Sequence, residues 1–312
     1  MIFKNLTDTK KTNIFVLILI LGQFLISFLS VYALGFIPDF YPTTQMAYHL
    51  LLFGLPVILY FIITKKPVRE VLSLRPLSIR NIITIILISF TMQPVLSVFS
   101  FLSSLVFKNN IASALMEMQD VSVGWIIVSM AVFPAVLEEI CYRGIVLYGY
   151  RNLNPLKACL MSGFLFGIMH FSAQQFLYAF FFGVILGYFV YKTKSIFASI
   201  VSHFTINASQ ILFSRVLSGL SLSEGYSSAT DMAGTEVFST LFYLISAVVF
   251  TAPFLLLFFW YFERINRDNG FLSDWNYQAG KPREKMFDAA IWVVILIYIA
   301  IAIVPEFYNY LA

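Results

Sequence analysis

The sequence contains few charged residues, few histidines and almost no cysteine, and these scarcities exclude several classes of protein. Charged residues make up 12% of the chain, whereas soluble globular domains carry about 25%. The cysteines are Cys141 and Cys159. They are too few for a disulfide framework or a cysteine metal cluster, and we expect small buried side chains. The net charge of +4 is carried by loops, where it sets topology, so we expect no nucleic-acid partner.

Hydrophobic residues dominate instead, at 60% of the chain. A helix needs about 20 apolar residues to cross a bilayer, and several runs reach that length. The sequence therefore predicts an all-α polytopic membrane protein with eight or nine transmembrane helices around an intramembrane polar cavity. The predicted spans are 13–35, 46–64, 81–106, 122–149, 156–171, 174–191, 196–214, 237–262 and 288–305.

The distribution of basic residues predicts the orientation. The first apolar run, residues 14–34, exceeds the roughly 7–15 residues of a signal-peptide core and lacks a small-residue cleavage site, so we interpret it as a retained helix. If the N-terminus is cytoplasmic, all lysines and arginines except Lys108 and Arg215 fall on the inner side. We therefore expect a multi-pass protein integral to the cell membrane, with nine crossings placing the C-terminus outside.

Two adjacent carboxylates interrupt the fourth span, at Glu138 and Glu139. A charge at the bilayer centre costs about 2.5–3.5 kcal/mol on insertion scales, so such residues require an explanation. Arg143 follows Glu139 by four positions and shares its helix face, which predicts an ion pair. Glu138 is rotated by about 100° and is free to point into a cavity. Pro134 removes a backbone hydrogen bond and predicts a kink beside the two glutamates.

Further polar residues lie in neighbouring spans. His170 ends the fifth span, and the seventh carries His203 and Asn207 one turn apart. The remaining histidine, His49, begins the second span, where we expect an interfacial role. Together these groups suit hydrolysis, because a carboxylate can take a proton from water, a histidine can orient that water, and an imidazole–amide pair can stabilise an oxyanion.

Other interpretations stay open at this stage. The Glu139–Arg143 pair can be a structural tie, and Asn207 can be an interhelical hydrogen bond. Intramembrane Glu, Arg and His residues also form ion or proton relays in transporters. A transporter is disfavoured because the halves show no repeat and the ionisable groups gather in one region. The small-xxx-small glycine pairs are interpreted as helix packing; they are Gly163/Gly167 and Gly183/Gly187.

Three motifs in order resemble a known family. "EEICYR" fits EExxxR, "FGIMH" fits FxxxH, and "HFTIN" fits HxxxN. On successive membrane helices they resemble the CPBP intramembrane proteases, also called the Abi or CAAX-protease family, which includes the Rce1-like endopeptidases. The resemblance covers approximately residues 122–215. Spans one to three and the segment after residue 216 are not assigned by it. We expect a single membrane domain over 1–312, with N-terminal helices at 1–121, a catalytic core at 122–215, and an outer loop, cytoplasmic connector and C-terminal helices at 216–312.

The resemblance also implies roles. Glu138 is the general base that activates water, and His170 helps to hold that water. Glu139 and Arg143 support the site, while His203 and Asn207 form the oxyanion hole. We favour no cofactor, although a zinc ion held by Glu138, His170 and His203 stays an alternative, because a His₂Glu set is a known catalytic zinc site. Family members commonly have eight spans, one fewer than counted here.

The expected substrate is a membrane-embedded or lipid-anchored peptide or protein within the lipid bilayer. A non-catalytic membrane partner on the same scaffold, such as an immunity factor that acts by binding, is the remaining alternative. The intact motif set argues against this alternative.

Overall fold

A computed structural model describes residues 6–29, 32, 42–108, 120–219, 234–267 and 285–306. Every regular element within these ranges is helical, and π-helical segments are labelled η. The elements are α1 (Asp8–Phe28), α2 (Pro42–His49), η3 (Leu50–Gly54), α3 (Leu55–Thr64), α4 (Val68–Val71), α5 (Ile79–Ser104), α7 (Val123–Ile127), η4 (Val128–Val132), α8 (Phe133–Glu139), η5 (Ile140–Val146), α9 (Leu147–Gly149), α10 (Pro155–Met169), α11 (Ala173–Thr193), α12 (Ile196–Gly219), α13 (Gly234–Ile265), α14 (Ala289–Tyr298) and η7 (Ile299–Ile303).

Each of the nine predicted spans contains a helix in the part of the chain that the structure describes, and eight of these stretches are long and apolar enough to cross a membrane. The exception is α10, whose 15 residues extend over about 22 Å, less than the roughly 30 Å hydrocarbon core. The chain is therefore a multi-pass membrane protein, and its described residues include eight full-length candidate spans and one shorter apolar helix. Most of the predicted loop at 217–236 and of the connector at 263–287 lies outside the described residues.

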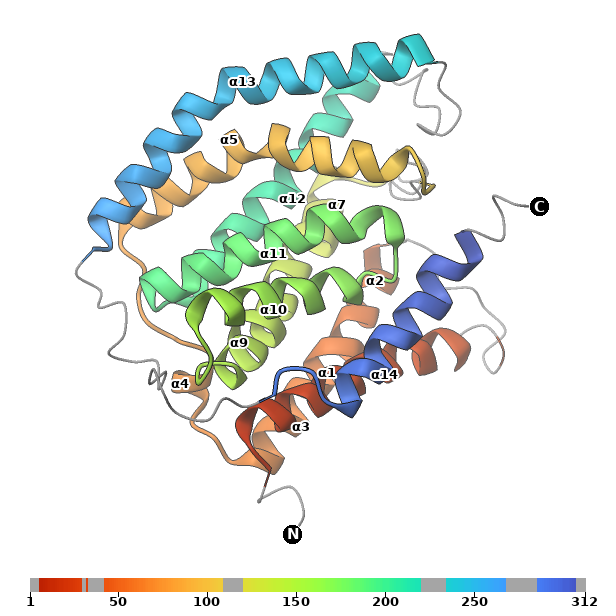
Figure 1. Cartoon of the computed structure of the whole chain (residues 1–312), viewed down its shortest axis with the longest axis vertical. Helices are drawn as coiled ribbons and strands as arrows, with labels where there is room; N and C mark the ends of the chain where they lie inside the picture. The colour runs from red at the N-terminus through yellow and green to blue at the C-terminus, as the bar shows by residue number, and fades with distance from the viewer. Residues whose placement is uncertain are drawn as a thin grey trace.

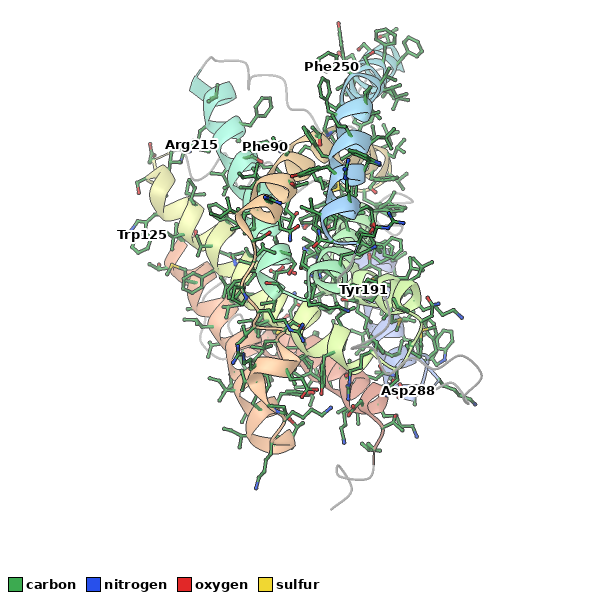
Figure 2. The ribbon with its side chains drawn as sticks, turned by 90° about the vertical axis from the view of Figure 1, so that its left-hand side faces the viewer. Phe90, Trp125, Tyr191, Arg215, Phe250 and Asp288 are labelled. Carbon is green, nitrogen blue, oxygen red and sulfur yellow. The ribbon has the colours of Figure 1, made fainter. Side chains whose placement is uncertain are left out.

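The helices run side by side in one array (Figure 1). α13 packs along α5, α10 and α11 form an antiparallel pair, and α1 lies against α14. α1 begins and the last helix ends at opposite ends of the array. Large apolar side chains project from the outer faces, where lipid replaces water, as Figure 2 shows for Trp125 and Phe250, which are 51% and 73% exposed.

Two apolar clusters meet at α11. One cluster combines α1, η5, α10 and α14 and includes Tyr142 and Phe166. The other combines α5, α11, α12 and α13 and includes Phe182. Because α11 contributes residues to both clusters, it fixes the helices that carry the three sequence motifs relative to one another.

Ion pairs gather at one end of the array. Asp8, at the start of α1, lies 2.6 Å from both Lys66, which follows α3, and Arg151, which follows α9. Partial burial lowers the pKa of Lys66, an effect that the pair with Asp8 opposes. Lys192 pairs with Glu263 at 2.6 Å, joining the ends of α11 and α13. We call the end of the array that carries these ion pairs the basic end. α12 begins at Ile196, just after the end of α11, and Arg215 lies near the opposite end of α12.

The close packing of α10 on α11 depends on glycine, as the small-xxx-small spacing predicts. A Cβ on Gly163 would lie 2.7 Å from the Val184 backbone nitrogen, and one on Gly183 would lie 2.8 Å from the Gly163 Cα. Side chains at these positions would therefore force the two helices apart. Both cysteines are free and buried, as expected, and Cys159 lies beside Gly187.

Candidate active site

The central part of the site is a buried ion pair that a histidine completes. The Glu139 Oε1 atom accepts hydrogen bonds from Arg143 Nη1 at 3.0 Å and from His203 Nδ1 at 2.9 Å. The Glu139 and Arg143 side chains are fully buried and His203 is nearly so. The predicted pair between Glu139 and Arg143 is therefore present. The hydrogen bond from His203 to Glu139 joins the third motif to the first.

The Arg143 guanidinium is fixed by three further features of its surroundings. Its Nη2 atom donates to the Gly183 carbonyl oxygen at 3.0 Å. Its Cζ atom lies 4.3 Å from the centre of the Phe166 ring, a cation–π contact that stabilises a desolvated cation. A Cβ on Gly183 would approach Nη2 to 3.0 Å, so this glycine also leaves room for the guanidinium.

Phe166 joins the second motif to the other two. Its ring meets the rings of His170 and His203 edge-on, with centroids 4.9 and 5.8 Å apart. The Phe182 ring also meets the His203 ring edge-on, with the two centroids 5.6 Å apart. The phenylalanine of FxxxH therefore acts as a spacer that sets the distance between both histidines and the arginine.

His170 has a defined tautomer. Its Nδ1 atom lies 2.8 Å from the Phe166 carbonyl oxygen, and a carbonyl can only accept, so Nδ1 carries a proton. In the neutral ring, Nε2 is then a free hydrogen-bond acceptor. His170 and His203 both interact electrostatically with the Glu138 carboxylate, so the three groups surround one region.

Glu138 has a partner that the sequence did not predict. Its Oε1 atom lies 3.3 Å from His49 Nε2, and both side chains are 13% exposed, in contrast to fully buried Glu139. The position of His49 at the start of a span had indicated an interfacial role, and this expectation is wrong, because the side chain is largely buried against Glu138. The only sequence signal was that it lies in an apolar run; nothing indicated that a residue 89 positions away would contact Glu138.

The His49–Glu138 contact requires one shared proton. His49 Nδ1 lies 2.8 Å from the Gln45 carbonyl oxygen, so Nδ1 is the donor. A neutral ring would then direct the Nε2 lone pair at a carboxylate oxygen. A hydrogen bond at 3.3 Å thus needs either an imidazolium beside a carboxylate or a neutral ring beside a carboxylic acid. In both forms the pair carries no net charge, which lowers the cost of placing Glu138 within a membrane helix.

Asn207 contacts the same predicted span, 122–149, that carries the two glutamates, but at Met130, earlier in that span. Its Nδ2 atom donates to the Met130 carbonyl oxygen at 3.1 Å. That carbonyl lacks the usual partner four residues later, because Pro134 has no N–H. One amide hydrogen of Asn207 fills this position and the second remains available.

Two π-helical segments flank the glutamates. η4 ends two residues before Pro134, and η5 begins immediately after Glu139. Within the second predicted span, η3 likewise ends two residues before Pro56 and begins immediately after His49. A proline cannot donate the i→i−4 bond, so the preceding turn readily widens, and π-helical turns are frequent at functional sites. The sequence predicted a kink at Pro134 but not these segments.

The residues do not fit the alternative zinc site. Across the described ranges, no three His, Cys, Asp or Glu side chains form a group that could hold a metal ion. This includes the proposed set of Glu138, His170 and His203.

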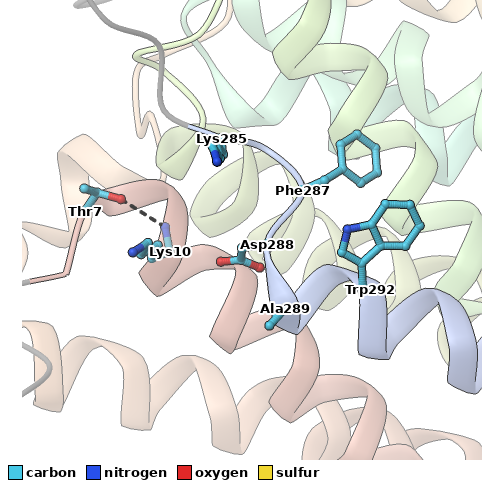
Figure 3. A pocket seen from close by; sticks show the side chains of 7 residues that line it. All are labelled: Thr7, Lys10, Lys285, Phe287, Asp288, Ala289 and Trp292. Carbon is cyan, nitrogen blue, oxygen red and sulfur yellow. Dashed lines mark hydrogen bonds between the residues drawn. The ribbon is translucent and has the colours of Figure 1, made fainter.

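Glu138 does not line either of two surface hollows. The larger, of about 720 Å³, lies between the starts of α1 and α14, where Lys10, Asp288 and Trp292 line it (Figure 3). It contains no motif residue. The smaller, of about 200 Å³, lies at the basic end, and Arg143 is part of its lining.

Comparison with known proteins identifies one family. Residues 120–209 match the family described as "Type II CAAX prenyl endopeptidase Rce1-like". No curated protein and no solved structure gives a significant match. The matched segment contains EExxxR, FxxxH and HxxxN, and thus Glu139, Arg143, Phe166 and His203, which contact one another.

Proposed function

We propose that this CAAX-type membrane peptidase, whose residues 120–209 match the Rce1-like family, cleaves a membrane-associated peptide or protein with water activated by Glu138. The observation that carries this proposal is the contrast between the two glutamates. Glu139 is fully buried and bound to Arg143 and His203, whereas Glu138 is partly exposed and held by one histidine. The first arrangement suits a structural support, and the second suits a base that must reach water.

In the proposed reaction, Glu138 takes a proton from a water molecule whose oxygen attacks the scissile carbonyl carbon. His49 engages Oε1, and no described side chain binds Oε2, so Oε2 remains for this water. His170 accepts a hydrogen bond from the same water through Nε2. When the tetrahedral intermediate collapses, the C–N bond breaks and Glu138 returns the proton to the leaving nitrogen.

His203 and Asn207 would stabilise the oxyanion. His203 donates from Nδ1 to Glu139, so its Nε2 atom can donate to an oxyanion only when the ring is an imidazolium. Asn207 contributes its second amide hydrogen. Glu139 and Arg143 act through His203 and are positioning residues, which matches the supporting role that the family resemblance implies.

The function is tested with purified protein in lipid nanodiscs and a library of membrane-anchored peptides, in water enriched in ¹⁸O. Mass spectrometry should find pairs of product peptides, with ¹⁸O in the new C-terminal carboxyl group. If the folded, purified protein leaves every peptide intact but transports ions across liposome membranes, the result would contradict the proposal and favour the transporter interpretation.

We also propose the orientation that the charges predict, with the basic end in the cytoplasm. Lys66, Arg151 and Lys194 lie at this end, and the η5 segment that follows Glu139 leads toward it. The substrate and water would then reach Glu138 from within the membrane or from the cytoplasmic side.

A further inference from the structure

The turn that follows His170 contains a residue in a strained backbone conformation. Phe171 has a φ of 44°, in the left-handed region that a bulky side chain rarely adopts. Glycine or asparagine is the usual residue where a helix ends in this way, but the turn between α10 and α11 reads His170, Phe171, Ser172. Such a conformation persists only where the surrounding structure holds it, and conformations of this kind gather at functional sites.

The left-handed turn determines which ring nitrogen of His170 carries a proton. In a continuing helix the backbone N–H of His170 would bond to the Phe166 carbonyl oxygen, four residues back. It bonds instead to the Gly167 oxygen at 3.3 Å, because the helix tightens and ends. The Phe166 oxygen then accepts from His170 Nδ1 at 2.8 Å. This bond fixes the tautomer, since the partner of one ring nitrogen decides which nitrogen is protonated.

A buried amide ties the turn to α5. Gln174, in the first turn of α11, is 2% exposed. Its Nε2 atom donates to Ser100 Oγ at 2.9 Å and lies 3.3 Å from the Ser100 carbonyl oxygen. A carbonyl oxygen can only accept, so the amide nitrogen faces Ser100. A buried amide that loses its partner is costly, so this contact resists movement of the start of α11 away from α5.

The last membrane helix also contacts this turn, but less closely. The Tyr298 hydroxyl oxygen lies 3.4 Å from the Ser172 carbonyl oxygen, which is longer than a strong O–H···O bond. The Tyr298 ring packs against Phe176, with the two centroids 5.6 Å apart. In the part of the chain that the structure describes, the bond from Gln174 to Ser100 is therefore the shortest hydrogen bond between the turn region and another helix.

We propose that Gln174 is a positioning residue that holds the Phe171 turn through Ser100 and thereby keeps His170 in the tautomer whose Nε2 atom accepts a hydrogen bond. The inference rests on the proposed function, in which that Nε2 atom orients the attacking water. Ser100 lies outside the matched residues 120–209, so α5 supports the site from outside the family segment.

The test compares the wild-type protein with Gln174→Leu in lipid nanodiscs. Solid-state ¹⁵N NMR of protein labelled in its three histidines distinguishes the two tautomers without any substrate, and His170→Gln assigns the His170 signals. We expect the wild-type His170 ring to carry its proton on Nδ1 and the Gln174→Leu variant to show a mixture of tautomers. For peptide cleavage, kcat should fall about three- to tenfold, as for the loss of one hydrogen bond. KM should change less, because Gln174 is buried.

Asn81→Leu is the matched control. Asn81 is also a buried amide that joins α5 to another helix, through two hydrogen bonds with Asn266. It lies near the start of α5, whereas Ser100 lies near the end, so Asn81→Leu should leave the His170 tautomer unchanged. Ser100→Ala is a milder variant that removes Oγ but keeps the carbonyl oxygen. It should change the tautomer in the same direction as Gln174→Leu, and it decides the question if Gln174→Leu does not fold.

A second substitution separates support of the turn from general packing. Glycine adopts a positive φ without steric cost, so Phe171→Gly in the Gln174→Leu background should restore the Nδ1-protonated tautomer and part of kcat. If Gln174 served only to pack α11 on α5, loss of the Phe171 side chain would weaken the structure further and restore neither.

Three results would overturn the inference. They are a wild-type tautomer in folded Gln174→Leu, an equal change in Asn81→Leu, and no recovery with Phe171→Gly. The NMR measurement needs no catalysis, so it also separates this inference from the proposed function. If the tautomer changes as expected but the wild-type protein cleaves no peptide, the role of Gln174 in holding the turn is supported and the proposed function is contradicted.

Discussion

The Nε2 atom of His49 lies 3.3 Å from Oε1 of Glu138 and links the second predicted span to the fourth. Stacking on Phe53 and the Nδ1 bond to Gln45 fix the imidazole ring. The contact orients one carboxylate oxygen and leaves the other for water.

We therefore expect His49→Phe to lower kcat by about tenfold or more, since a hydrogen bond to a charged group is lost. KM should change less, because His49 does not contact substrate in this account. His49→Gln retains an N–H donor and should recover part of kcat, which a purely space-filling role would not explain. Wild-type kcat in His49→Phe would remove His49 from the mechanism.

The Gly183 and Gly187 pair offers a test of the α10–α11 contact. Gly183→Ala would place a Cβ against Gly163 and the Arg143 guanidinium, so we expect a loss of about 1–3 kcal/mol in stability. Gly187→Ala should be nearly neutral, because its Cβ meets only Cys159 at 3.4–3.5 Å. Thermal unfolding in detergent measures both, and equal Tm values for the two variants would contradict the packing.

Arg143→Leu removes one partner of a buried pair and leaves Glu139 without its arginine. Such a change costs about 3–5 kcal/mol, so both folded yield and activity should fall. The double variant Glu139→Gln/Arg143→Leu removes the uncompensated charge and should recover stability without activity. A well-folded but inactive Arg143→Leu protein would instead indicate a direct role in substrate binding.

The orientation predicts which cysteine variants react with an impermeant thiol reagent. Lys157→Cys should label from the cytoplasmic side and Arg215→Cys from the outer side. Wild-type protein is the control, because Cys141 and Cys159 are buried. A cysteine beside the base, Leu137→Cys, should react with the same polar reagent from the cytoplasm if water reaches the site there. Labelling of Leu137→Cys only from outside would overturn both the orientation and the access route.

The fold and the local part of the site could be predicted because both depend on short-range patterns. Apolar run length determines the helices, and four-residue spacing determines the Glu139–Arg143 pair. By contrast, the bond from His203 to Glu139 depends on how two helices rotate against each other, which spacing within one helix does not determine. The sequence predicted only that these residues would be near one another.

The contact of His49 with Glu138 likewise depends on how two helices rotate against each other, which the sequence does not determine, and it has a second requirement. It needs the π-helical segment after His49, and such a segment has no periodicity that distinguishes it from an α-helix in an apolar run. The signal that was present is the proline two residues after each of η3 and η4. Pro56 and Pro134 each remove an i→i−4 donor, and both wide turns precede them.

The central claim is that Glu138, and not its neighbour, takes the proton from water. The direct measurement is kcat of Glu138→Gln against a membrane-anchored peptide, together with the affinity for that peptide and the Tm of the variant. Glu236→Gln, an exposed carboxylate at the start of α13, is the matched control.

We predict that Glu138→Gln folds normally and binds the peptide, while kcat falls by at least the roughly 10²–10⁴-fold that general-base catalysis contributes. The amide resembles the carboxylate in shape but cannot take a proton. A Glu138→Gln protein that cleaves the peptide at the rate of the Glu236→Gln control would contradict the account.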